Sequence, residues 1–146
     1  MNVGADAAFT WPLRVYYEDT DAGTVVYYAN YLKYFERCRT EWLRTLGVNQ
    51  SELTRVHGLQ FVVTEVQIRY LRPALLDDQL TIEARVVRLG RCSLVFEQRV
   101  HRGAELLAQA RIEVACIGSQ RRPTRLPASL SARIRIGAAR FQGRSR

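Results

Sequence analysis

Apolar residues between positions 29 and 47 recur at intervals of three and four along the chain. They are Tyr31, Tyr34, Phe35, Cys38, Trp42, Leu43 and Leu46. This spacing gathers them on one broad face of an α-helix that begins near Ala29, and Gly47 suits the left-handed turn that ends a helix. So broad a face predicts a helix largely enclosed by other structure. Asn49, with Glu52 three residues later, predicts the capped start of a short second helix that ends at Gly58.

Beyond Gly58 the period of the pattern changes to two. Apolar and polar residues alternate in four stretches, at 66–70, 80–87, 94–100 and 111–116. Alternation gives each strand one packed and one wet face, as in an antiparallel sheet. Links too short for helical crossovers predict hairpins and a meander, with a turn at Gly103 between the last two strands; the links are 73–78, 90–91 and 102–104. A shorter β-type run, LRVYY at 13–17, precedes the helix.

A sheet with one apolar face and a helix with a broad apolar face bury each other if the sheet wraps the helix. The pattern therefore predicts an α+β fold, with a long central helix wrapped by an antiparallel β-sheet. A chain of 146 residues fits one domain, which we place at residues 1–130. Pro123 and Pro127 then lead into a basic C-terminal tail, residues 131–146, which we expect to be flexible.

The net charge is +8 at pH 7, but the excess belongs to the C-terminal end of the chain. Residues 119–146 hold eight arginines and no acid, and the rest has equal numbers of basic and acidic residues. Because the body has no basic excess, the sequence argues against nucleic-acid binding. No apolar run approaches the roughly 20 residues of a membrane span. The N-terminus lacks the basic start and apolar core of a secretory signal, so we expect a cytoplasmic protein.

The three cysteines, Cys38, Cys92 and Cys116, are far apart and form no C-x-x-C pair. His57 and His101 also stand alone, so the chain shows no zinc-site spacing. We interpret the cysteines as buried free thiols, and we expect no metal or other cofactor.

Three acids, Glu18, Asp19 and Asp21, crowd into the stretch YYEDTDAGTVVYYANY at residues 16–31. Like charges this close oppose one another's ionisation. The cluster is therefore either a solvated turn, where Asp and Gly are common, or a working site. Its spacing does not fit a calcium loop, and the chain has no G-x-S-x-G elbow and no glycine-rich phosphate loop. Any chemistry must rest on carboxylates and backbone groups.

The helix expected to begin about eight residues after Asp21 adds a second element. The first turn of a helix presents unpaired N–H groups and a partial positive charge. A carboxylate facing this turn provides a base or nucleophile beside a cradle for an oxyanion, the two parts that acyl transfer needs. Gly23 lets the intervening backbone turn tightly. The spacing permits such a site without requiring it.

The run from Tyr17 to Glu41, YEDTDAGTVVYYANYLKYFERCRTE, closely resembles the signature of hotdog-fold acyl-CoA thioesterases of the 4-hydroxybenzoyl-CoA thioesterase family. It is most similar to the bacterial subgroup associated with the Tol-Pal envelope system. The likeness continues through FVVTEVQIRYLRPALLDDQLTI, LVFEQRV and RPTRLP, and it covers roughly residues 13–130. The hotdog fold is a long helix wrapped by an antiparallel sheet, so the resemblance implies the same architecture as the periodicity.

The resemblance implies that the carboxylate of Asp21 attacks a thioester carbonyl or activates the water that does, and the sequence leaves both roles open. It implies that the backbone N–H of Tyr28 polarises that carbonyl, at a position where the nearest subgroup often has histidine. Thr24 stands where glycine or isoleucine is common in the family. Glu36 falls at the position of an acid that lines the acyl pocket, although a glutamate on an amphipathic helix is ordinarily just solvated.

The resemblance also implies partners. Arg88, Arg91 and Ser93 flank the Gly90 hairpin, where related enzymes hold the nucleotide of coenzyme A, and arginine suits its phosphates; the alternative is a solubilising charge. Hotdog subunits pair, so we expect a homodimer or homotetramer with sites at the interface. The carrier of the acyl group is either coenzyme A or acyl-carrier protein.

Two other functions stay open at this point. A hotdog hydratase or dehydratase would need a histidine beside its acid, and His57 and His101 both lie outside the acidic stretch. A non-catalytic module could dock acyl-carrier protein or anionic lipid through the basic tail, with a weak contribution of about 1 kcal/mol from each arginine near a membrane surface.

Overall fold

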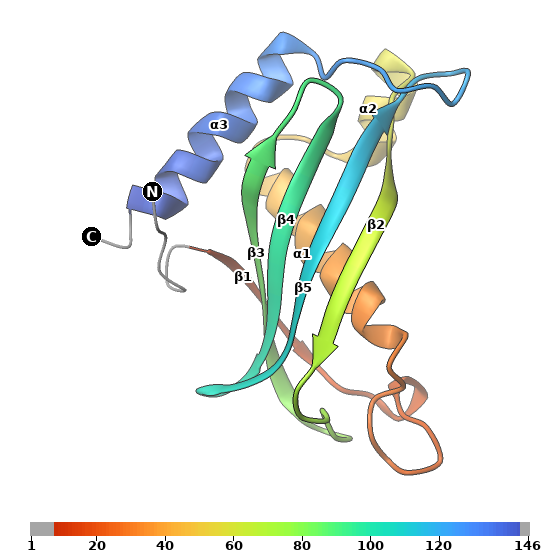
Figure 1. Ribbon diagram of the computed structural model, residues 1–146, viewed down its shortest axis with the longest axis vertical. Coiled ribbons are helices and arrows are strands. Elements are labelled where there is room, and N and C mark those ends of the chain that lie inside the picture. The colour runs from red at the N-terminus through yellow and green to blue at the C-terminus, as the bar shows by residue number, and fades with distance from the viewer. Residues whose placement is uncertain (1–7, 144–146) are drawn as a thin grey trace.

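The computed structural model describes residues 8–143 as five strands and three α-helices (Figure 1). The strands are β1 (Phe9–Arg14), β2 (Gln60–Tyr70), β3 (Gln79–Leu89), β4 (Ser93–Arg102) and β5 (Glu105–Ile117). The helices are α1 (Asn30–Thr45), α2 (Gln50–His57) and α3 (Ala128–Gly143), and a short 3-10 turn, η2, spans Tyr17–Asp19. The long helix α1 lies against one face of the sheet, which confirms the α+β prediction.

The strand order is β1-β3-β4-β5-β2, and every neighbouring pair is antiparallel. Strands β3, β4 and β5 form the expected meander, with Gly103 at φ +60° in the β4–β5 turn. The prediction that β2 also belongs to this meander is wrong. The free edge of β3 is taken by β1, so residues 71–78 carry the chain across the sheet end and β2 pairs with β5 at the opposite edge.

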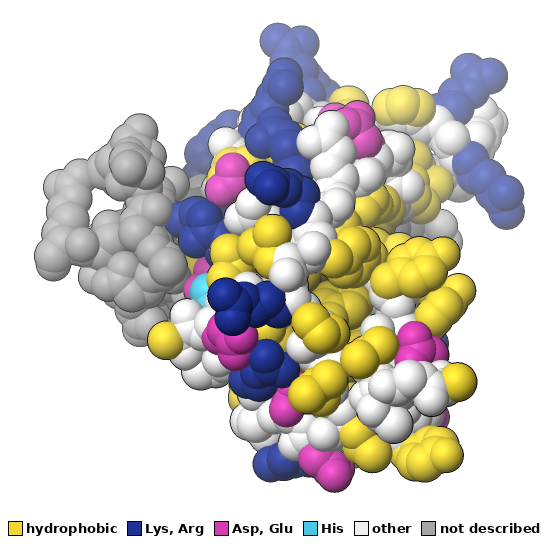
Figure 2. Space-filling model, turned by 60° about the horizontal axis from the view of Figure 1, so that its bottom comes forward, with side chains coloured by type: hydrophobic (Ala, Val, Ile, Leu, Met, Phe, Trp, Pro, Cys, Tyr) yellow, Lys and Arg dark blue, Asp and Glu magenta, His cyan; other side chains and the backbone are white. Residues whose placement is uncertain are grey.

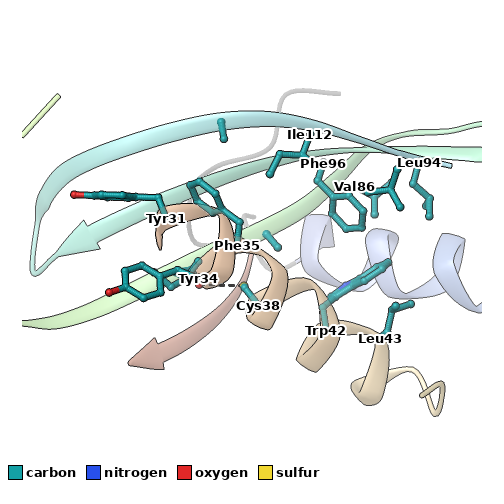
Figure 3. Close-up of a cluster of buried hydrophobic side chains, with 14 of the residues drawn as sticks. Tyr31, Tyr34, Phe35, Cys38, Trp42, Leu43, Val86, Leu94, Phe96 and Ile112 are labelled. Carbon is teal, nitrogen blue, oxygen red and sulfur yellow. Dashed lines mark hydrogen bonds between the residues drawn. The ribbon is translucent and has the colours of Figure 1, made fainter. Parts of the chain in front are cut away.

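The broad apolar face of α1 packs into the core, as its spacing predicts (Figure 3). Tyr34, Phe35 and Cys38 are fully buried, and Trp42 meets the ring of Phe96 edge-on with 5.5 Å between centroids. The facing surface comes from the inward positions of β3, β4 and β5. Helix α1 is therefore the centre of the core.

The cysteine prediction is confirmed for Cys38 and Cys116, which are free and buried. Cys92 is free but only half-buried. It precedes β4 in the β3–β4 hairpin, at the end of the sheet rather than inside it.

The first strand begins and ends earlier than its sequence pattern indicates. It spans Phe9–Arg14 rather than 13–17, because its partner positions on β3 run from Ala84 to Gln79. The chain then leaves the sheet in the η2 turn, where the carboxylate of Asp19 accepts a hydrogen bond of 2.8 Å from the N–H of Tyr16. This side-chain contact fixes the exit of the chain from β1.

Helix α3 was not expected from the sequence, which placed the start of a basic tail at residue 131. Leu130 and Ile134 of α3 are buried in the core, and a Cβ on Gly137 would lie 2.6 Å from a methyl group of Leu46. Arg133 and Arg135 are exposed. The flexibility of the basic tail stays a prediction, and its last residues lie outside the described part of the chain. No described helix is long and apolar enough to span a membrane.

Replacing Ile134 with Ala tests whether α3 belongs to the folded domain. The side chain is fully buried, and truncating a buried Ile leaves a cavity that costs about 2–5 kcal/mol. We expect the free energy of unfolding in urea to fall by that amount. The matched control is Ile136→Ala, two residues along and 62% exposed, which should change it by less than about 0.5 kcal/mol. Equal small effects would mean that α3 contributes nothing to stability.

Candidate active site

Asp21 sits at the tip of a tight turn between η2 and α1. Its N–H donates to the carbonyl of Val25 at 2.9 Å, and its own carbonyl accepts from the N–H of Thr24 at 3.0 Å. The carboxylate is exposed, and Oδ1 accepts a hydrogen bond of 2.8 Å from the N–H of Gly23. That contact orients the carboxylate and leaves Oδ2 without a partner among the described residues. Thr24 takes φ +66°, a left-handed conformation that is uncommon for a β-branched residue.

The turn rests on the 71–78 link between β2 and β3. The N–H of Val26 donates to the carbonyl of Ala74 at 2.9 Å, and the N–H of Leu76 donates to the carbonyl of Thr24 at 3.3 Å. The link is held in turn by Arg102 of β4, whose guanidinium donates to Asp78 Oδ2 at 2.7 Å and to the carbonyl of Pro73 at 3.1 Å. A charged clamp from the sheet therefore supports the loop that carries Asp21.

Asp19 joins the turn to the start of α1. Its carbonyl accepts from the N–H of Tyr27 at 2.9 Å and from the amide of Asn30 at 2.8 Å. Burial, and then the nearby Asp19 carboxylate, raise the pKa of Tyr34 above its usual range, so this phenol stays neutral. Asp19 therefore holds the turn against the start of α1 through its backbone carbonyl and its carboxylate.

The start of α1 leaves one backbone donor free. The N–H of Tyr28 has no hydrogen-bond acceptor among residues 8–143, although its neighbours Tyr27 and Asn30 both donate to backbone carbonyls. The Tyr28 carbonyl accepts a hydrogen bond of 2.9 Å from the hydroxyl of Tyr70, at the end of β2. Tyr28 is 62% exposed. A fixed helix start with an available N–H is the donor arrangement that stabilises an oxyanion.

Glu36 lies two turns into α1, at the mouth of an apolar cavity between the helix and the sheet. Its carboxylate accepts a hydrogen bond from the hydroxyl of Thr40. The cavity of the single chain is small, about 50 Å³, and is partly open to solvent. Its lining comes from α1, α2, β2, β4 and β5: Glu36, Arg39, Thr40, Leu43, Gln50, Phe61, Val63, Leu94, Phe96 and Val114.

Two polar residues beside this cavity escaped the sequence analysis. Gln98 is fully buried on the inward face of β4, where its amide donates to the carbonyl of Phe35 at 3.1 Å and accepts from Arg39 Nη1 at 2.9 Å. Burial lowers the pKa of Arg39, and the nearby Glu36 opposes that effect. The sequence does contain a signal for Gln98. It lies between Phe96 and Val100 at a position that the alternation assigns to the core, where an apolar residue is expected.

Arg88, Arg91 and Ser93 lie around the β3–β4 hairpin, at the opposite end of the sheet from the turn that carries Asp21 (Figure 1). Both arginines are exposed and Ser93 is half-buried. Within one chain Asp21 lies in the turn that precedes α1, and the hairpin residues lie at the other end of the sheet.

Known proteins place this architecture in one class. A family model described as the thioesterase superfamily matches residues 23–109, which is more than half of the chain. The fold is that of the hotdog thioesterases, as solved neighbours show. The chain belongs to the thioesterase superfamily and is a thioester hydrolase.

Individual relatives match most of the chain. The acyl-CoA thioesterase YbgC of Haemophilus influenzae is 44% identical over 128 residues, which cover 87% of this chain and 94% of that protein. A probable thioesterase from Bartonella henselae superposes with a TM-score of 0.80 at 41% identity, covering 82% of this chain and 99% of that one. A thioesterase from Thermus thermophilus, complexed with coenzyme A and zinc, has a TM-score of 0.79 at 29% identity, covering 93% and 97%. The expected likeness to the Tol-Pal-associated subgroup is thereby confirmed.

Removing the clamp under the turn tests its role. Arg102→Met keeps the length of the side chain but removes its contacts with Asp78, Glu105 and Pro73. Hydrogen bonds to charged groups are worth about 1.5–3 kcal/mol, so we expect a lower melting temperature and a roughly threefold to tenfold lower kcat for thioester hydrolysis. Arg72→Met is the matched control, because Arg72 also pairs with Glu105 but is largely exposed. Equal effects of both substitutions on kcat would contradict the clamp.

Proposed function

We propose that the protein hydrolyses acyl-CoA thioesters to a free acid and coenzyme A at the turn carrying Asp21. The observation that carries this proposal is the unpaired N–H of Tyr28 at a fixed helix start, close along the chain to an oriented, exposed carboxylate. The substrate class is supported by the acyl-CoA thioesterase named among the relatives and by the coenzyme A complex of a 29% identical neighbour.

Two reaction routes fit these groups. In one, an Asp21 oxygen attacks the thioester carbonyl, the C–S bond breaks, coenzyme A leaves as the thiolate, and water then cleaves the resulting anhydride. In the other, Asp21 accepts a proton from the water that attacks the carbonyl directly. Both routes place negative charge on the carbonyl oxygen, and the Tyr28 N–H stabilises it there. One such donor is typically worth about 3–4 kcal/mol in the transition state.

We propose that the protein works as a homodimer formed through β2. One edge of β2 pairs with β5, and no strand among residues 8–143 pairs with its other edge. Its inward-facing Val63, Val66 and Tyr70 are 38–48% exposed, and Leu32 on α1 is 41% exposed. Figure 2 shows apolar side chains gathered on one face of the molecule, beside the charged ones. An open strand edge with so much apolar surface favours pairing with a second copy. Further pairing into a homotetramer stays a prediction.

A two-fold axis between antiparallel β2 strands would turn the partner end for end. The partner's β3–β4 hairpin would then lie at the same end of the joint sheet as the Asp21 turn, about 10–15 Å from the shared edge at the usual strand spacing. This arrangement gives Arg88, Arg91 and Ser93 a way to hold the phosphates of the nucleotide, although in one chain they lie far from Asp21. The dimer thus joins two halves of one proposed site.

The direct experiment measures thiol release by the purified protein from short, medium, long and aromatic acyl-CoA substrates. We expect turnover of at least one class. Parallel assays with acyl-carrier-protein thioesters identify the preferred carrier. A protein that releases thiol from none of these thioesters would rule out the proposal. Docking of acyl-carrier protein or anionic lipid through the basic tail stays a prediction, since no described contact favours it.

A further inference from the structure

The cavity beside α1 is mainly apolar but holds two charged groups. Leu43, Leu94, Phe96 and Val114 are buried in its walls. Glu36 and Arg39, one turn apart on α1, face the same space. Glu36 is exposed at the edge of the cavity, whereas Arg39 is half-buried. A partly buried charge costs free energy unless its hydrogen-bond donors are used, so the partners of Arg39 decide what the cavity can bind.

Arg39 has more donors than the protein uses. A guanidinium carries five N–H donors, and the described residues provide one hydrogen-bond acceptor, Gln98 Oε1 at 2.9 Å. The carbon at the centre of the guanidinium lies 5.9 Å from the centroid of the Phe96 ring. No carboxylate of residues 8–143 lies within ion-pair distance of it. The Gln98 contact fixes the guanidinium, and the remaining N–H groups are available to a ligand.

Glu36 provides the complementary acceptor. One carboxylate oxygen accepts from the Thr40 hydroxyl, and the other has no partner among the described residues. Glu36 and Arg39 together leave the cavity with no net charge, so an anionic group on the ligand would gain from one and lose to the other. A hydroxyl fits better, because it accepts from Arg39 and donates to Glu36.

The position of this pair along α1 determines where on the acyl group such a hydroxyl would be. Arg39 follows the first helical residue, Asn30, by nine positions, which is about 13 Å along the helix axis at 1.5 Å per residue. Helix side chains lean back toward the N-terminus, which shortens that separation somewhat. A thioester carbonyl held at the Tyr28 N–H therefore lies well away from Arg39. A hydroxyl that reaches Arg39 belongs at the far end of a medium-length aliphatic chain.

We propose that Arg39, fixed by Gln98 and assisted by Glu36, makes the enzyme selective for aliphatic acyl groups that carry a hydroxyl at the distal end. This inference rests on the proposed function, since it takes the cavity as the acyl pocket of that site. It assigns Arg39 as a specificity-determining residue that contacts the acyl group and takes no part in breaking the thioester.

Matched pairs of substrates test the inference. The probes are hexanoyl-, octanoyl- and decanoyl-CoA, each compared with its ω-hydroxy derivative, and the readout is the ratio of the two kcat/KM values. We expect at least one pair to favour the hydroxylated substrate by about 10- to 100-fold, the range for a hydrogen bond to a charged group. Both substrates are measured on the same protein, so a general loss of activity or stability cancels from the ratio.

Substitutions of Arg39 then test whether this residue causes the preference for the hydroxylated substrate. Arg39→Met should bring the ratio close to one, because the hydroxyl then loses its charged partner. Arg39→Lys, which keeps the charge over buried Gln98, guards against misfolding of the Met variant and should reduce the ratio only in part. The matched control is Arg37→Met, because Arg37 is exposed and lies over the Tyr34 ring outside the cavity. It should leave the ratio unchanged.

The outcomes separate this inference from the proposed function. Hydrolysis of the unsubstituted substrates with no preference in any pair overturns the selectivity and leaves the thioesterase intact. A preference that survives in Arg39→Met, or that falls equally in Arg37→Met, also overturns the role of Arg39. Absence of hydrolysis with all six probes overturns the inference as well, and the wider panel of thioesters then decides the proposed function by itself.

Discussion

Asp21→Asn is expected to reduce turnover of acyl-CoA substrates by about 10²–10⁴-fold, the usual contribution of a positioned acid–base group. The substitution keeps the size of the side chain, and its amide oxygen can still accept from the N–H of Gly23. It removes the negative charge that either attacks the carbonyl or takes the proton from water. Because Asp21 is exposed, folding should be unaffected. Thiol release from several acyl-CoA substrates measures the turnover, and thermal unfolding checks that the variant is folded.

Glu18→Gln is the control for Asp21→Asn. Glu18 is also an exposed acid of the same stretch, so its substitution changes the local field by the same charge without touching the proposed chemistry. We expect it to alter kcat by less than about threefold. Near-full turnover by Asp21→Asn, or an equal loss in Glu18→Gln, would show that the carboxylate of Asp21 is not the reacting group.

The two routes open to Asp21 differ in the fate of one oxygen atom. If Asp21 attacks the carbonyl and water then cleaves the anhydride at the Asp21 carbon, a single turnover in heavy-oxygen water leaves labelled oxygen in its carboxylate. If Asp21 only activates water, the label goes to the released acid. Label found by mass spectrometry in the peptide that contains Asp21 would therefore establish the covalent route.

Val66→Lys in β2 is expected to separate the proposed dimer and to abolish most of the activity with it. Val66 faces the inner side of the sheet and is 38% exposed in the single chain, so the lysine can be solvated in a monomer. In a two-fold dimer the substitution would bury two like charges near the axis, at a cost of several kcal/mol. We expect the dissociation constant to rise at least about 100-fold, which corresponds to about 2.7 kcal/mol. Sedimentation velocity over a dilution series measures it.

Gln67→Lys adds the same charge one residue along, on the outer face of β2 beside Arg111. It should leave the dimer and its turnover largely intact. A wild-type protein that stays monomeric at assay concentration while turning over substrate would contradict the shared site. A Val66→Lys variant that is monomeric and fully active would contradict it equally.

Features of the fold that depend on residues close together in the sequence could be predicted from it. The extent of α1 follows from the spacing of its apolar residues, and Gly47 ends it at φ +79°. Asn49 caps α2 through a hydrogen bond of 2.8 Å from the N–H of Glu52, and Gly58 ends it in the left-handed conformation. These features are encoded within a few residues, so no tertiary contact is needed to predict them.

Strand order and α3 depend on distant contacts and were missed. Alternation in β2 tells which of its residues face inward but not which strand lies beside it. In α3 the arginine-rich composition indicated a solvated tail, whereas Ile134 and the close approach of Gly137 to Leu46 anchor it to the body. The large apolar residues of α3 include Ile136, which is exposed, so their spacing does not define one clear apolar face.

In the candidate site, too, residues close together in the sequence could be predicted, and those joined by distant contacts could not. The turn at Asp21, the helix start at Tyr28 and the acid at Glu36 are read from one continuous stretch of sequence. Arg39 and Gln98 are 59 residues apart, and their contact exists only because β4 packs under α1. In the proposed dimer the hairpin around Arg91 reaches the site from a second chain, so no pattern within one sequence determines its distance from Asp21.

The pairing of β2 with β5 also affects how the protein is made. Strand β2 ends at Tyr70, and its neighbour β5 is complete only at Ile117. At a synthesis rate of about 5–20 residues per second, an apolar strand waits about 2–9 s on the ribosome before its neighbour exists. We therefore expect the yield of folded protein to depend on translation speed and chaperone access during that interval.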